Sequence, residues 1–202
     1  MNVKFQVGEN MSSYYSEARF NNWVNRIKES NIDIEDADSL AVFDQMMEDF
    51  VVACLNVIRA VRERELTKKQ AMEELDNMEK ILLSEVDFSD PLKNDFFEFV
   101  RESLKVVVWS TRYYLERKIS KKDFDALLKE AIKKEKEGNF EEAMKVVARM
   151  GAKIFNGEKL PDDLEMPEDG MVLNWLDGVD VINTVMILSE IDVPTEESDD
   201  EE

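Results

Sequence analysis

The chain has 202 residues, of which 44% are hydrophobic and 36% are charged, and its formal net charge is −20. That hydrophobic fraction is enough for a folded core and excludes wholesale disorder. The length fits a single domain. The negative charge repels phosphate backbones and anionic lipids, so we expect no direct binding to nucleic acid and none to a membrane.

The reactive side chains exclude much of enzyme chemistry. The chain has no histidine and one cysteine, Cys54. These counts exclude Ser-His and Cys-His nucleophile pairs, imidazole metal sites, zinc fingers and iron–sulfur clusters. The six glycines form no phosphate-loop pattern. We therefore assign no catalytic residue, no cofactor and no metal ligand, and expect Cys54 to be a small buried hydrophobe.

Helical periodicity begins after a flexible N-terminal arm over residues 1–12. The first helix is expected to start at Ser13 or Ser16 and to end at Asn31. One face of this helix carries apolar residues at the spacing i, i+3, i+4, i+7, namely Phe20, Trp23, Val24 and Ile27.

Three further helices are expected in the middle of the chain. Asp38 or Ser39 can cap a long second helix. The third helix follows a capping box over 67–70, in which glutamine lies three residues after threonine. Ser89-Asp90-Pro91 is a start signal for the fourth, which is apolar on all sides at 106–109 and should be the most buried.

The fifth and sixth helices are predicted to form a hairpin. The fifth opens over 120–123 and ends at Gly138, and a capping box from Asn139 opens the sixth. The segment 131–143 resembles a single tetratricopeptide motif, but a solenoid needs about three repeats. An ordinary helical hairpin explains the same pattern.

The seventh helix is predicted over about 171–189, with Gly178 indicating a close approach to another helix. Residues 190–202 form an acidic tail, expected to be disordered, that carries eight of the acidic residues and no basic one. The rest of the chain keeps a charge of −12, so acidity is not confined to the tail. The sequence thus predicts an all-α, single-domain bundle of about seven helices over 13–189.

Two pairs of carboxylates could support Mg²⁺-dependent chemistry. All-helical nucleotide pyrophosphohydrolases use Glu-x-x-Glu followed by Glu-x-x-Asp on the next helix, and this chain has Glu73-x-x-Asp76 and Asp95-x-x-Glu98. The residue types and their order differ from that pattern. Solvated helix faces explain these spacings better in such an acidic chain.

Aromatic residues beside polar ones are the candidates for binding a protein partner. We name Tyr15, Arg19, Trp23, Trp175 and Asp177 as candidate partner-binding residues. Both tryptophans also lie on apolar stripes, so a role in the core is the stronger alternative.

Two segments resemble an archaeal family catalogued as domain of unknown function 2150. The first covers residues 14–27, which open with Tyr14-Tyr15-Ser16-Glu17 and contain the pair Asn22-Trp23. The second covers residues 170–180, which contain Asn174-Trp175-Leu176-Asp177-Gly178. The resemblance implies an archaeal cytosolic protein of acidic, helical character. It implies no activity and no catalytic residue.

Three functions remain compatible with the sequence. A non-enzymatic adaptor or regulator that binds a protein partner, possibly a basic one, is the first. A Mg²⁺-dependent all-α nucleotide hydrolase and an acidic chaperone for a basic protein are the alternatives. The N-terminus has no apolar signal region and no uncharged apolar stretch reaches about 18–20 residues, so a cytoplasmic location is expected. The sequence is also compatible with a homodimer.

Overall fold

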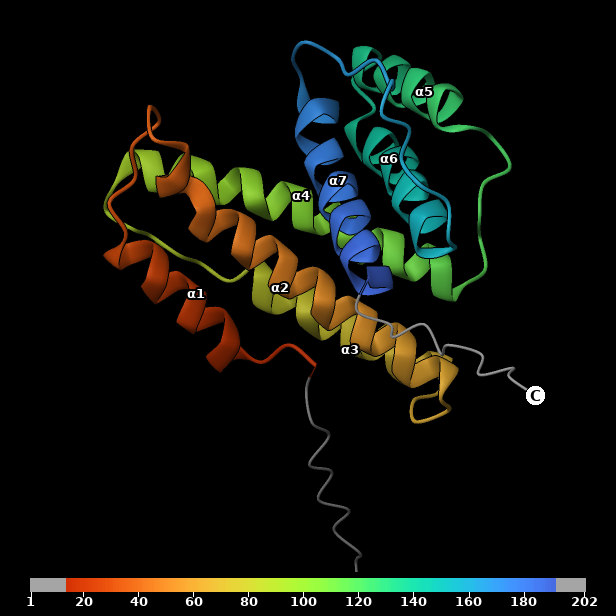
Figure 1. Cartoon of the computed structure of the whole chain (residues 1–202), viewed down its shortest axis with the longest axis horizontal. Coiled ribbons are helices and arrows are strands. Elements are labelled where there is room, and N and C mark those ends of the chain that lie inside the picture. The colour runs from red at the N-terminus through yellow and green to blue at the C-terminus, as the bar shows by residue number, and fades with distance from the viewer. Residues whose placement is uncertain (1–13, 192–202) are drawn as a thin grey trace, which may run out of the picture.

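A computed structural model of the chain describes residues 14–191 and consists of seven α-helices (Figure 1). In chain order they are α1 (Glu17–Glu29), α2 (Ala37–Arg62), α3 (Lys68–Leu82), α4 (Pro91–Leu115), α5 (Phe124–Lys136), α6 (Phe140–Phe155) and α7 (Met171–Ile191). The described part of the chain contains no strand. The prediction of an all-α bundle of about seven helices is confirmed.

The predicted terminal segments fall largely outside the described residues. The arm over 1–12 lies outside them entirely, and so does the tail from residue 192 onward. Helix α7 extends to Ile191, so the first two residues assigned to the tail belong to the last turn of a helix.

Most helix starts were predicted from their capping residues. Ser16 caps α1, the Thr67–Gln70 capping box opens α3, and Asp90 caps α4 with Pro91 in the first turn. Asp123 caps α5 by accepting a hydrogen bond from the backbone N–H of Ala126. Side-chain acceptors before an apolar periodic run therefore located these starts correctly.

Two cap predictions were wrong. Helix α2 is capped by Asp36 and not by Asp38 or Ser39, because the Ser39 hydroxyl is engaged with the backbone of Asp33. Asn139 makes no side-chain cap for α6. It follows Gly138 in a tight turn, where its own N–H closes α5 by donating to the carbonyl of Lys134.

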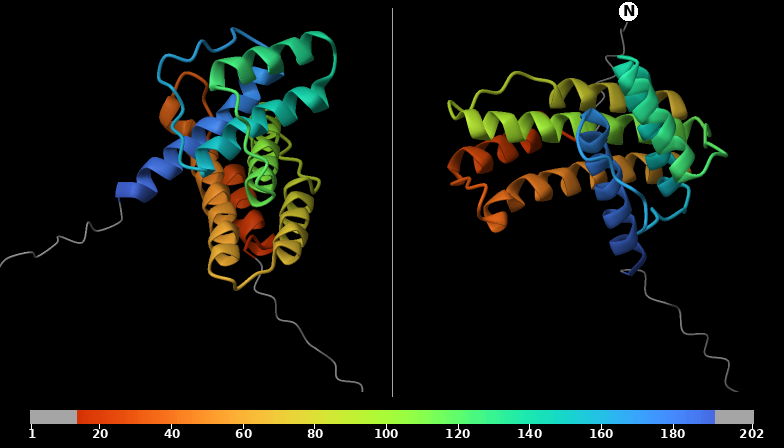
Figure 2. Two further views of the ribbon diagram at one scale, coloured as in Figure 1. Left: turned by 90° about the vertical axis from the view of Figure 1, so that its right-hand side faces the viewer. Right: turned by 90° about the horizontal axis from the view of Figure 1, so that it is seen from above.

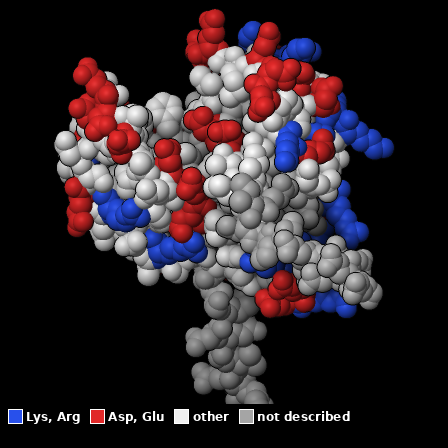
Figure 3. Space-filling view, in the orientation of Figure 1, with Lys and Arg blue, Asp and Glu red and all other residues white. Residues whose placement is uncertain are grey.

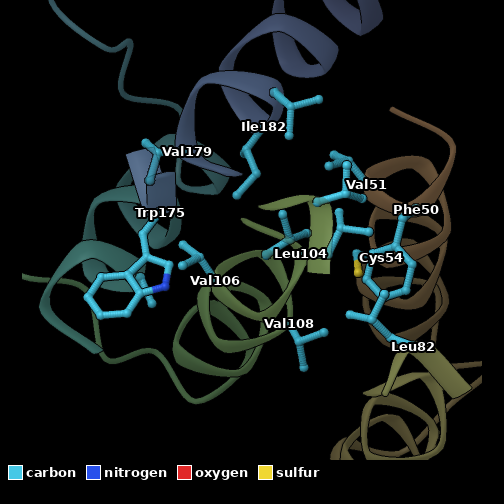
Figure 4. Packing of buried hydrophobic residues seen from close by; sticks show 14 of the residues in the cluster. Phe50, Val51, Cys54, Leu82, Leu104, Val106, Val108, Trp175, Val179 and Ile182 are labelled. Carbon is cyan, nitrogen blue, oxygen red and sulfur yellow. The ribbon is translucent and has the colours of Figure 1, made fainter. Parts of the chain in front are cut away.

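Helix α4 is the central element. It packs against α2 and α3 on one side and against α6 and α7 on the other, and α7 crosses it (Figures 1 and 2). Val106, Val107 and Val108 of α4 are fully buried, as the all-round apolar run predicts. Figure 4 shows Leu104 and Val106 between the apolar side chains of α7 and those of α2, so one core joins the two sides.

Helix α7 is also the most membrane-like segment in the described residues. Over Met171–Ser189 it is long and apolar enough to cross a membrane by length and composition alone. Half of this segment is buried inside the fold. Its aspartates, Asp177 and Asp180, keep it short of an uncharged apolar stretch.

The contact between α7 and α4 depends on glycine. A Cβ atom added to Gly178 would overlap the backbone carbonyl oxygen of Ser103. The Ser103 hydroxyl donates to the carbonyl of Asn174 at 3.0 Å, which fixes the register of the two helices. The close approach predicted from Gly178 is confirmed.

Replacing Gly178 by alanine tests this contact, because the packing determines whether the substitution raises or lowers the stability of the fold. In an open helix Gly→Ala would stabilise by up to about 1 kcal/mol. Here the methyl group meets backbone, which cannot move aside, so we expect Gly178→Ala to destabilise the fold by about 1–3 kcal/mol. Urea unfolding followed by circular dichroism measures the change, and a more stable variant would contradict the packing described.

Candidate functional site

The three N-terminal candidate residues meet at one carboxylate on α2. Asp49 accepts two hydrogen bonds from the Arg19 guanidinium, at 2.6 and 2.8 Å, and one from the Trp23 indole N–H at 2.8 Å. Tyr15 is fully buried and its ring lies 4.8 Å from that of Phe50. The hydrogen bond to Asp49 raises the pKa of Arg19.

These contacts are those of an internal anchor. Tyr15 and Trp23 present almost no surface to a partner, and the bidentate Arg19–Asp49 pair fastens α1 to α2. The partner-binding role of Tyr15, Arg19 and Trp23 stays a prediction, and the burial of Tyr15 and Trp23 favours a role in the core for these two residues.

Removing the shared carboxylate should loosen α1. Asp49→Ala leaves the indole of Trp23 without its acceptor and removes the charged partner of Arg19, whose guanidinium keeps only backbone carbonyl acceptors. We therefore expect a loss of about 1–3 kcal/mol of unfolding free energy. Glu48→Ala is the control, because it removes the same charge from the neighbouring position of α2. Urea titration of both variants measures the difference, and equal stabilities would refute the anchor.

Helix α7 separates the two C-terminal candidate residues. Trp175 faces α4 and α6, whereas Asp177 faces α2 and α4. The sequence suggests that these two residues belong to one site, but in the structure they lie on different surfaces. Each surface is a groove with its own chemistry.

The first surface is an aromatic groove of about 430 Å³. Its apolar lining consists of Trp109, Phe140, Met144, Met171 and Trp175. Phe140 is 50% exposed at the mouth, while Trp175 is 3% exposed and donates its indole N–H to Glu102 at 3.0 Å. A rigid aromatic floor with an exposed aromatic edge is typical of pockets that take an anchoring side chain.

The charged rim of the aromatic groove is internally paired. Arg112 binds Glu79 at 2.7 Å, Lys145 binds Glu141 at 2.6 Å and Lys105 binds Glu102 at 2.5 Å. Arg112 and Lys145 also lie over the Trp109 ring, at 5.0 and 5.5 Å from its centroid. An apolar group can therefore enter this groove without leaving a rim carboxylate unpaired.

The second surface is a smaller acidic cleft of about 200 Å³ between α2, α4 and α7. Asp44 and Asp177 line it above an apolar floor that includes Phe43 and Phe99, the latter 55% exposed. Figure 3 shows acidic side chains gathered where the two halves of this face meet. Asp177 is exposed as a whole, but the α2 and α4 side chains around its carboxylate desolvate it in part, which raises its pKa to about 6, with further contributions from Asp180 and Asp44.

The raised pKa of Asp177 predicts a pH-dependent penalty. The folded state disfavours the charged carboxylate, so above about pH 6 the ionised Asp177 lowers the free energy of unfolding. This loss disappears as the pH falls from about 6 to the unfolded pKa near 4, because the carboxyl group is then protonated in the folded protein. We expect Asp177→Asn to raise the melting temperature at pH 7.5. The gain should shrink toward zero between pH 6 and pH 4.

Thermal unfolding of the wild type and of Asp177→Asn across this range measures the effect. Glu98→Gln is a suitable control, because Glu98 is exposed and paired with Arg101. A gain from Asp177→Asn that is constant with pH would contradict the assignment.

The carboxylates of the hydrolase alternative do not converge. Glu73 pairs with Lys69, Asp76 with Arg112 and Glu98 with Arg101, each on an exposed helix face. No group of three or more potential metal-binding side chains occurs among residues 14–191. The geometry that a carboxylate-held Mg²⁺ would need is thus missing from this part of the chain.

Cys54 lies in the core, as its apolar surroundings predict. It is fully buried, and burial raises the pKa of its thiol to about 12. The thiolate needed for nucleophilic chemistry is therefore strongly disfavoured.

Four residues of the aromatic groove were missed as candidates from the sequence. Trp109 and Met144 belong to apolar runs and look like ordinary core residues, and Met171 begins a helix. Phe140 carried a usable signal, because it follows Gly138-Asn139 in a hairpin turn, where an aromatic residue has little to pack against. The remaining three depend on how α4, α6 and α7 meet.

The structure defines a helical-bundle protein with two grooves beside α7 and no convergent carboxylate centre in residues 14–191. The chain belongs to the family DUF2150, described as an uncharacterized protein conserved in archaea, whose model matches residues 13–193. The resemblance of the two terminal segments to this family is confirmed. No curated protein and no solved structure matches the chain.

Proposed function

We propose that this protein is a non-enzymatic adaptor or regulator that binds another protein through the aromatic groove. The observation that carries the proposal is the exposed Phe140 at the mouth of a groove floored by Trp109 and Trp175. Tryptophan and neighbouring aromatic residues supply large contact area at low entropic cost, and such residues dominate binding energy at protein interfaces.

The chemistry of the groove suggests an apolar anchor on the partner. Met144 and Met171 are flexible side chains that can adapt to the shape of an inserted group. Each rim carboxylate has a basic partner, but Arg112 also pairs with Asp76 and Lys145 also pairs with Glu142, so the rim keeps an excess of negative charge, as the whole protein does. A partner segment with an apolar anchor flanked by basic residues would match both features.

The test compares two exposed phenylalanines on different surfaces. Phe140→Ser alters the aromatic groove, and Phe99→Ser alters the acidic cleft, with nearly equal exposure of the two side chains. A partner is first isolated from archaeal lysate with the full-length wild type, then purified and titrated against each protein by calorimetry. We expect Phe140→Ser to weaken binding at least about tenfold and Phe99→Ser to leave it within about twofold.

Other outcomes discriminate between the alternatives. Loss with Phe99→Ser alone would move the interface to the acidic cleft, as an acidic chaperone for a basic protein requires. Equal affinity of all three proteins would refute both grooves. Sedimentation of the isolated chain distinguishes self-association, because a homodimer through the groove would dissociate with Phe140→Ser in the absence of any partner.

A further inference from the structure

Four helices end in the same hydrogen-bonded turn, yet they use two different residue types at its critical position. In each turn the residue after the C-cap adopts a positive φ, and the next N–H donates back to a carbonyl five residues earlier. Glycine holds this position after α5 and α6, at Gly138 and Gly157, with φ of 77° and 96°. Arginine holds it after α2 and α4, at Arg64 and Arg117, with φ of 63° and 58°.

Arginine is an unfavourable residue for this position. The left-handed conformation brings a Cβ atom against the following carbonyl, which is why glycine and asparagine predominate there. Non-glycine residues held in this region occur preferentially at functional sites. The chain uses glycine after α5 and α6, so the turn itself does not require arginine.

Both of these arginines line one pocket. Helices α2, α4 and α6 end on the same side of the molecule (Figure 1). The pocket between these helix ends, here called the arginine pocket, has a volume of about 560 Å³. Its lining consists of Arg62, Arg64 and Arg117 with Ile58, Val61, Tyr114, Leu115, Ile119 and Asn156.

The three guanidinium groups have no acidic partner among the described residues. No carboxylate lines the pocket, and none of the three arginines makes an ion pair or a side-chain hydrogen bond within residues 14–191. Three carboxylates are adjacent to these arginines in sequence: Glu63 and Glu65 flank Arg64, and Glu116 precedes Arg117. None of the three lines the pocket, and Glu116 pairs with Lys118 at 2.7 Å. Such a cluster of arginines is unexpected in a chain with 46 acidic and 26 basic residues.

Helix dipoles explain only part of this arrangement. A cation near a helix C-terminus is favourable, which accounts for Arg62 in the last turn of α2. The dipole accounts neither for the left-handed backbone of Arg64 and Arg117 nor for the exclusion of carboxylates from the lining. Because the helix ends themselves repel anions, the guanidinium groups would have to supply all the attraction for a negatively charged ligand.

We propose that the arginine pocket binds a small phosphate-bearing molecule. Guanidinium groups match phosphate oxygens in bidentate geometry and stay charged at any physiological pH. The apolar floor, with the half-buried ring of Tyr114, would receive the uncharged body of the ligand. The volume is in the range of small-molecule sites. This site lies apart from the aromatic groove and does not depend on the proposed adaptor function.

The test uses inorganic pyrophosphate, titrated calorimetrically into the full chain at low salt. We expect binding to the wild type that weakens at least about tenfold in Arg64→Gly and in Arg117→Gly. Because glycine suits the left-handed turn, the same two variants should melt about 2–4 °C higher than the wild type. A merely unfolded variant cannot give this combination. Arg59→Gln is the control, since it removes an exposed arginine from the same end of α2 outside the pocket and should bind as the wild type does.

A second arm tests whether the chain's own acidic end occupies the pocket. In a full-length variant, the carboxylates of residues 196–202 are replaced by amides. Pyrophosphate binding to both this variant and the wild type supports the proposal. Binding to the amide variant alone overturns an external phosphate as the ligand and assigns the arginines to the chain's own carboxylates. Absence of binding to both, or equal loss with Arg59→Gln, overturns the site.

Discussion

The backbone contact between Gly178 and Ser103 sets the geometry on which both grooves depend. Helix α7 lies against α4 at a distance that only a residue without a side chain allows. From that position its two flanks face different neighbours, with Trp175 toward α6 and Asp177 toward α2. A larger residue at 178 would push α7 outward and change the width of both grooves together, so the two surfaces are linked by one steric constraint.

Charge pairing distinguishes the three surfaces more sharply than net charge does. In the aromatic groove each acidic side chain of the rim has a basic partner, so none of these carboxylates is left unpaired beside the apolar floor. In the acidic cleft, desolvation raises the pKa of Asp177, and neighbouring carboxylates of α7 and α2 raise it further. In the arginine pocket, no carboxylate of the described residues lies in the lining. The total of −20 describes none of these local situations.

Sequence reasoning succeeded where structure is determined locally. Capping residues and apolar spacing located the helices, because a cap and its first turn lie within four residues of each other. Two caps differed from the prediction because of other local hydrogen bonds. Ser39 is bonded to the backbone of Asp33, so Asp36 caps α2 instead, and Asn139 follows Gly138 in the turn that closes α5. Gly178 was interpretable because a glycine costs stability inside an apolar helix, and close packing against another backbone offsets that cost.

The grooves could not be predicted in the same way, because each joins residues from at least three helices. Trp175 and Asp177 are two positions apart in sequence, which suggests one site, but two residues span about 200° around a helix, so they face opposite ways. The acceptor for Arg19 and Trp23 is Asp49, which lies on another helix and has no local signature. Arg19, Trp23 and Asp49 form a cluster only because α1 packs on α2.

The last two turns of α4 connect the proposed partner surface to the arginine pocket. Trp109 lines the aromatic groove, and Tyr114 and Leu115 line the arginine pocket about one and a half turns later. The segment between them carries Ser110 and Thr111, both fully buried and hydrogen-bonded to carbonyls of the preceding turn. Coupling between two sites would require an element with two discrete arrangements. The buried, hydrogen-bonded side chains of Ser110 and Thr111 instead fasten this segment of α4 into the core, so the aromatic groove and the arginine pocket are built on one common support.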